Sequence, residues 1–169
     1  MTLPAGPDAV ARVLADPEFT SAVARSAGAL DQHVDVTGDP AREFTVTSRR
    51  ALPTDQIPAH LRGFVGTSIE IRQVEAWEAP QPDGARAGTV LVEITGAPVR
   101  LTGRAHLAGT GPTTSELRYA GEIRAAVPLF GAAVEQAVAA AVRSALAATG
   151  AEAVRRLAAG SGHDTAEQP

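Results

Sequence analysis

The sequence predicts a single α+β domain in which a meander of antiparallel strands is followed by one long C-terminal helix. Two short segments with helical spacing come first, and segments that alternate polar and apolar residues, joined by short turns, fill the middle. A 3.6-residue apolar periodicity then returns after Pro128. The length of 169 residues suits one domain, which we place at residues 1–158. Residues 159–169 carry no large apolar side chain, and we expect a disordered tail there.

Two short helices are expected before the first strand. Asp8 can cap a helix whose apolar residues recur with helical spacing up to Leu14. Asp16-Pro17-Glu18 can then start a second helix, because Asp16 can accept the first free amide hydrogens and Pro17 fits the first turn. Gly28 is expected to end that helix.

Six segments alternate as half-buried strands do. They lie at about residues 30–37, 43–49, 67–79, 90–94, 99–107 and 116–124. In the third, a phase slip between Ile71 and Val74 predicts a β-bulge. Prolines between the second and third strands cannot join a central ladder, so we expect a short helix there, from Asp55 to about Phe64.

The last element is predicted as a helix from about Leu129 to Leu157. Its apolar residues form a stripe with i, i+4 spacing, at Phe130, Val134, Val138, Val142 and Leu146. The alanines beside this stripe allow close approach to a sheet. Because much of the apolarity comes from alanine, we expect no membrane span here, and without a visible targeting segment we expect a cytoplasmic protein.

Composition excludes several classes of function. The chain contains no cysteine and no lysine, which excludes disulfide scaffolds, thiolate zinc sites, cysteine nucleophiles and P-loops. The four histidines lack close metal-ligand spacing, so neither a metal nor a cofactor is expected. The net charge of −4 and the mixture of arginine with glutamate on the later strands argue against nucleic acid as a partner. The oligomeric state stays open.

Several short motifs, in this order and spacing, connect the chain with a known family. They are Asp16-Pro17-Glu18-Phe19, Leu52-Pro53 with Ile57-Pro58, Glu75-Ala76-Trp77, and Val127-Pro128-Leu129-Phe130-Gly131 followed by Glu135. Over about residues 8–158 the chain resembles the SRPBCC superfamily, which includes the START and polyketide cyclase-like proteins, and more narrowly the uncharacterised bacterial family DUF2505. The resemblance implies a helix-grip fold, in which a curved sheet of six or seven strands wraps around the C-terminal helix. That superfamily usually opens with a β-strand, so residues 1–5 are either a vestigial strand or follow a start further upstream.

The resemblance also implies a pocket between the sheet and the helix for a small hydrophobic molecule, such as a lipid or a polyketide-like compound. Alternation assigns the inward positions, and many of them carry short side chains that favour an open pocket. The alternative is that the same side chains simply pack against one another. The residues expected to bind the ligand are Phe44, Val46, Ile69, Ile71, Trp77, Val92, Ile94, Leu101, Leu117, Tyr119, Phe130 and Val134.

Three functions remain open at this point. The first is noncatalytic binding, possibly with transport, of the small hydrophobic molecule. The second is an enzyme of the cyclase or aromatase type that uses Glu75, Tyr119 or Arg50 in the same cavity; we expect Glu75 to face solvent, although an inward Glu75 could act as a general base. The third is a ligand-free structural or partner-binding domain. An open cavity without a buried ionisable group would favour the binding function. A buried carboxylate or arginine at the cavity would favour the enzyme, and a filled interior would favour the ligand-free domain.

Overall fold

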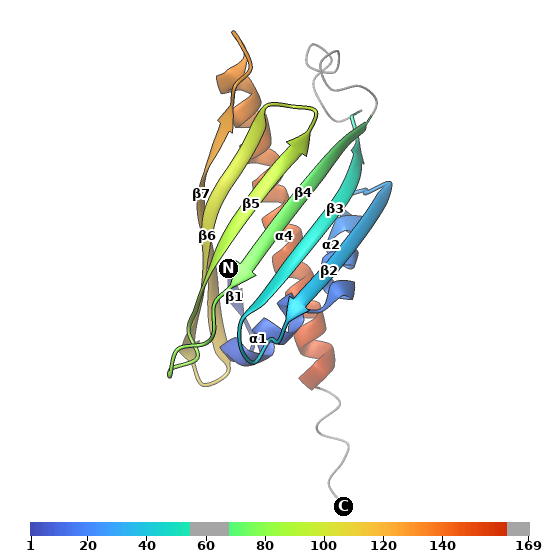
Figure 1. Ribbon diagram of the computed structural model, residues 1–169. Helices are drawn as coiled ribbons and strands as arrows, with labels where there is room; N and C mark the ends of the chain where they lie inside the picture. The colour runs from blue at the N-terminus through green and yellow to red at the C-terminus, as the bar shows by residue number, and fades with distance from the viewer. Residues whose placement is uncertain (55–67, 162–169) are drawn as a thin grey trace, which may run out of the picture.

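The computed structural model describes residues 1–54 and 68–161 and confirms the α+β class. Seven antiparallel strands form one curved sheet, and the helices of the described residues all lie against the same face of it (Figure 1). The elements are β1 (Thr2–Leu3), α1 (Pro7–Leu14), α2 (Pro17–Ser26), β2 (Asp31–Gly38), β3 (Phe44–Pro53), β4 (Ser68–Trp77), β5 (Arg86–Thr95), β6 (Val99–Gly111), β7 (Thr114–Ala125) and α4 (Gly131–Ser161). The short helix expected from Asp55 lies outside the described residues.

The sheet is a meander with one displaced strand. Its order is β1-β7-β6-β5-β4-β3-β2, so β1 pairs with β7 at one edge, and it is only two residues long. Gly103 of β6 and Gly121 of β7 lie opposite each other. A Cβ at Gly103 would meet a backbone oxygen at 2.7 Å and one at Gly121 would meet another at 2.6 Å, so only glycine allows the two strands to run this close. The pair also leaves this part of the concave face without side chains.

The two N-terminal helices form where expected, with one difference in capping. Asp16 caps α2, and its Oδ1 accepts a hydrogen bond from the Glu18 amide at 2.9 Å. Gly28 follows that helix with φ at +79°, the left-handed conformation that favours glycine. The predicted cap of α1 is wrong: Gly6 is the N-cap and Pro7 the first helical residue, which places Asp8 in the first turn.

The predicted bulge in β4 is absent. Pairing with β3 continues without a shift from Trp77 opposite Phe44 to Ser68 opposite Pro53, and pairing with β5 is equally regular. Val74 therefore faces the outer side of the sheet, where it lies beside Leu91. The apparent phase slip came from this outward apolar pair, and Glu75 consequently shares the inner face with Trp77.

Helix α4 crosses the concave side of the sheet (Figure 1). It begins at Gly131, after an exposed Leu129 with φ at +65°, and it continues through Ser161. The predicted domain boundary at residue 158 thus falls inside the helix, and residues 162–169 lie outside the described part. Near its start, Glu135 accepts a hydrogen bond from the Ala125 amide at 3.0 Å, which ties the helix to the end of β7.

By length and composition α4 meets the criterion for a helix that could cross a membrane, contrary to the expectation from its alanine content. A mostly buried core helix of a soluble protein can meet the same criterion, but only 11% of this stretch of α4 is buried within the structure.

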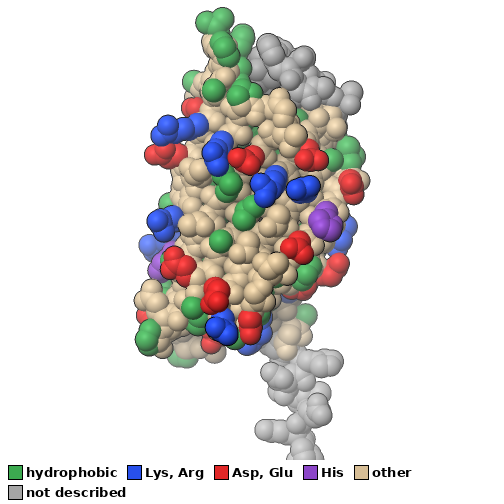
Figure 2. Space-filling view, in the orientation of Figure 1, with side chains coloured by type: hydrophobic (Ala, Val, Ile, Leu, Met, Phe, Trp, Pro, Cys, Tyr) green, Lys and Arg blue, Asp and Glu red, His purple; other side chains and the backbone are tan. Residues whose placement is uncertain are grey.

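The core lies where α1, α2 and the C-terminal part of α4 meet the sheet. Leu3, Val10, Leu107 and Ala153 have no exposed surface there. Trp77 stacks on Phe44, with ring centroids 6.1 Å apart. The opposite face of the sheet carries charges of both signs, scattered among polar side chains (Figure 2). The main hydrophobic core therefore lies on the concave side.

Candidate functional site

A partly enclosed cavity of about 200 Å³ remains between the concave face of the sheet, α2 and the middle of α4. Its walls are mainly apolar. They are formed by Leu14, Phe19, Thr20, Val23, Ala24, Ala27, Val46, Ser48, Arg50, Gln73, Glu75, Val90, Val92, Leu101, Gly103, Arg104, Tyr119, Ala120, Gly121, Val142, Ala145, Leu146 and Thr149. The paired glycines of β6 and β7 supply no side chain to fill this space, and α4 presents the small Ala145 to it.

Four polar side chains form one hydrogen-bonded chain along the cavity wall. Arg50 Nη1 donates to Gln73 Oε1 at 3.1 Å, and Gln73 Nε2 donates to Glu75 Oε1 at 2.7 Å. Tyr119 Oη, from β7, donates to Glu75 Oε2 at 3.3 Å. The regular pairing of β4 brings Gln73 and Glu75 onto the inner face with Arg50, and the side chain of Tyr119 reaches past the glycine pair.

Burial shifts the pKa values of three of these groups. Desolvation raises the pKa of Glu75, while hydrogen bonds from Gln73 and Tyr119, the indole N–H of Trp77 and the charge of Arg50 partly offset that rise. The indole N–H lies near Glu75, although the indole nitrogen has no partner at hydrogen-bond geometry among the described residues. Desolvation lowers the pKa of Arg50, opposed by Glu75. The pKa of Tyr119 lies well above its usual value, because the phenol is desolvated and sits beside the Glu75 carboxyl.

The expectation that Glu75 faces solvent is wrong. It depended on the bulge in β4, and without that bulge the carboxyl group lies on the inner face, half-buried and hydrogen-bonded at both oxygens. A carboxyl group with a raised pKa beside a cavity can act as a proton donor or acceptor. The arrangement therefore offers both a binding anchor and an acid–base group.

The residues predicted to bind a ligand fall into two groups. Val46, Val92, Leu101 and Tyr119 line the cavity. The other predicted residues do not border it: Phe44, Trp77 and Leu117 are buried in the core, Ile69, Ile71, Ile94 and Val134 are half-buried elsewhere, and Phe130 precedes α4 with 40% of its surface exposed. Phe130 and Val134 were placed too near the cavity because it faces a later part of α4, around Ala145.

Sequence reasoning missed one complete wall of the cavity. Helix α2 contributes Phe19 and Val23, and its C-cap Ala27 follows at the same four-residue spacing. This i, i+4 spacing was a readable signal for a helix that packs inward. Helical periodicity alone does not show whether the apolar face meets a core or a cavity.

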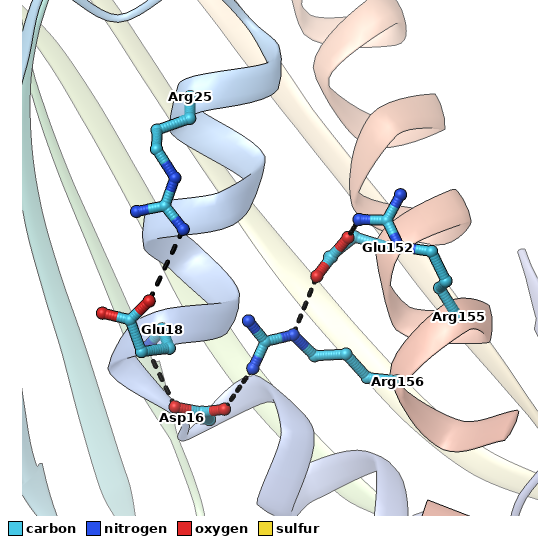
Figure 3. Close-up of polar contacts among 6 residues, drawn as sticks. All are labelled: Asp16, Glu18, Arg25, Glu152, Arg155 and Arg156. Carbon is cyan, nitrogen blue, oxygen red and sulfur yellow. Dashed lines mark hydrogen bonds and ion pairs between the residues drawn. The ribbon is translucent and has the colours of Figure 1, made fainter. Parts of the chain in front are cut away.

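A cluster of charges joins the start of α2 to α4 (Figure 3). Arg156 Nε donates to Glu152 Oε1 at 2.8 Å, and Arg156 Nη1 pairs with the capping residue Asp16. Glu152 also pairs with Arg155 and is itself buried. The Arg156 guanidinium lies 6.0 Å from the centre of the Phe19 ring. The cluster thus fixes the start of one cavity wall against the other helix.

Among the described residues no group of three or more histidine, aspartate or glutamate side chains could hold a metal ion.

Comparisons with known proteins place the chain in a family. No curated protein matches the chain. The family DUF2505, described as a protein of unknown function, matches residues 1–157. The chain therefore belongs to the DUF2505 family.

Proposed function

We propose that the chain is a helix-grip protein of the SRPBCC superfamily and that it binds a small, largely apolar molecule in the cavity between the sheet, α2 and α4. The observation that carries the proposal is the cavity itself: apolar walls with one hydrogen-bonded polar chain on one side. Ligand sites commonly have this combination, because apolar walls supply affinity and a few polar groups set orientation. A filled interior would have favoured a ligand-free domain, and the cavity counts against that alternative.

The size of the cavity limits the ligand. Its volume of about 200 Å³ corresponds to roughly six or seven water-sized groups. Drug-sized ligands occupy pockets of about 300–1,000 Å³. The expected lipid or polyketide-like compound is therefore narrowed to a short molecule of about seven non-hydrogen atoms. We further propose that the protein acts in the cytoplasm.

Isothermal titration calorimetry with 1-hexanol, hexanoate and hexylamine tests the proposal. We expect at least one of these to bind the wild-type chain with one-to-one stoichiometry. Ala145→Phe places a ring in the cavity and should abolish binding, whereas Ala147→Phe, on the exposed side of the same helix, should leave binding unchanged. Absence of binding by all three probes, or equal binding by both variants and the wild type, would contradict a ligand site in this cavity.

Acid–base catalysis in the same cavity is a second candidate, favoured by the buried Glu75. Its raised pKa suits proton abstraction next to a carbonyl group. We rank binding first because both carboxylate oxygens already accept hydrogen bonds from Gln73 and Tyr119. Exchange of the α-hydrogens of 2-hexanone with deuterium oxide tests the alternative by NMR. Exchange accelerated by the wild-type chain and lost in Glu75→Gln would support catalysis, and exchange at the same rate in both would exclude this role for Glu75.

A further inference from the structure

Arg50 differs from the other three side chains of this network because, among the described residues, it makes a single side-chain hydrogen bond. It occupies an inward position on β3, borders the cavity and is half-buried. Within the described part of the chain, one of the five N–H donors of its guanidinium is used, in the hydrogen bond to Gln73 Oε1 at 3.1 Å. Across the described residues, no carboxylate oxygen lies within 4.0 Å of its nitrogens. Within the described residues this cation therefore has no direct ion-pair partner, and the charge of Glu75 acts on it from beyond Gln73.

Glu75, the acidic member of the same hydrogen-bonded network, has more of its hydrogen bonds made than Arg50. Each carboxylate oxygen of Glu75 already accepts a hydrogen bond, one from Gln73 Nε2 and one from Tyr119 Oη. Within the described residues, each oxygen of this carboxylate thus has a donor, whereas the guanidinium of Arg50 makes a single hydrogen bond.

We infer that the ligand of this cavity is a short-chain carboxylate whose anionic group binds Arg50 and whose hydrocarbon part lies against Val92, Leu101 and Leu146. The inference rests on the proposed function and specifies the class of ligand. A carboxylate matches the planar fork of a guanidinium with two parallel hydrogen bonds, which are charge-assisted and stronger than neutral ones. It would also place a counter-charge in direct contact with a half-buried cation, which Glu75 reaches only from beyond Gln73.

Glu75 bears on this choice in two ways. A cationic ligand would seek that carboxylate, where donors from Gln73 and Tyr119 already occupy one acceptor position on each oxygen. An anionic ligand would be repelled by a charged Glu75, yet burial raises the pKa of this group and so favours its neutral form. The surroundings of Glu75 therefore disfavour an amine more than a carboxylic acid.

Calorimetric titration with hexanoate, 1-hexanol and hexylamine tests the inference through Arg50 and its neighbour. Arg50→Met keeps an apolar stem and removes the charge, and Arg49→Met makes the same change on the exposed outer face of the same strand. We expect hexanoate to bind the wild-type chain about tenfold or more tightly than 1-hexanol, the gain of a charge-assisted pair. Arg50→Met should remove this preference, while Arg49→Met should retain it.

Arg50→Lys keeps a positive charge and should restore part of the preference, and thermal unfolding by circular dichroism checks that each variant is folded. Equal binding of hexanoate and 1-hexanol would overturn the inference and leave the proposed function standing. Tighter binding of hexylamine, or a preference for hexanoate that survives Arg50→Met, would also overturn it. Binding of none of the probes would remove the proposed function and the inference together.

Discussion

Replacing Ala145 with leucine tests whether the space beside α4 is empty. Ala145 is half-buried and borders the cavity of about 200 Å³. Leucine adds three carbon atoms, each contributing about 0.8 kcal/mol when buried. The loss of side-chain rotamer freedom opposes this by about 0.5–1 kcal/mol. The variant should therefore raise the free energy of unfolding by about 1.5 kcal/mol.

Urea unfolding, followed by circular dichroism, measures this change at constant m-value. Ala147→Leu makes the same substitution on the exposed side of α4 and should change the free energy of unfolding by less than about 0.5 kcal/mol. Extra carbon atoms forced into a filled interior cost about 1–3 kcal/mol. A loss of stability of that size in Ala145→Leu, with Ala147→Leu unchanged, would refute the cavity.

Three further predictions concern stability. Arg156→Met should lower the free energy of unfolding, measured with urea, by about 2 kcal/mol, a value between those for exposed and buried ion pairs. Arg143→Met makes the same change on the exposed side of α4 and should leave the free energy of unfolding nearly unchanged. Equal effects of the two substitutions would contradict a role for the charge cluster in holding α2. As pH rises, the stability of Glu75→Gln should increase relative to that of the wild type. The pKa of Glu75 is raised in the folded state, so the group stabilises the fold fully only below its unfolded-state pKa. That stabilisation is lost as pH rises through the folded-state pKa, and glutamine, which does not titrate, is unaffected. A difference that is constant with pH in thermal unfolding would count against a desolvated carboxyl. Gly121→Ala should lower the free energy of unfolding by about 1–3 kcal/mol, because the added Cβ would lie 2.6 Å from a backbone oxygen. Gly160→Ala, whose Cβ would meet nothing within 4 Å, should not lower it. Chemical unfolding measures both values.

Much of the fold could be predicted because its signals are local. Strict alternation located β6 and β7, and the sequence Asp16-Pro17-Glu18 located the start of α2. Alternation failed in β4, where the outward Val74 mimicked a bulge. An apolar residue on the outer face is ordinary when it lies beside another such residue on the next strand, as Val74 does with Leu91, and that neighbour cannot be identified from one strand alone.

The cavity could be predicted only in part, because its position depends on how the helices cross the sheet. The alternation of side chains along each strand correctly placed Val46, Val92 and Leu101 on the inner face. It could not show which part of that face the helices would cover. Phe44 and Trp77 became core, since they stack on each other near the helices. The polar chain was hidden by the error in β4, although Gln73 and Glu75 share a parity with Trp77.

Isotope-filtered NOE spectroscopy of the wild-type chain with unlabelled hexanoate tests the central claim most directly, because it locates the bound molecule. We predict NOEs from the terminal methyl group of hexanoate to the methyl groups of Leu101 or Leu146. NOEs only to exposed apolar side chains such as Leu129 and Val154, or no intermolecular NOE at saturating hexanoate, would contradict binding between the sheet and α4.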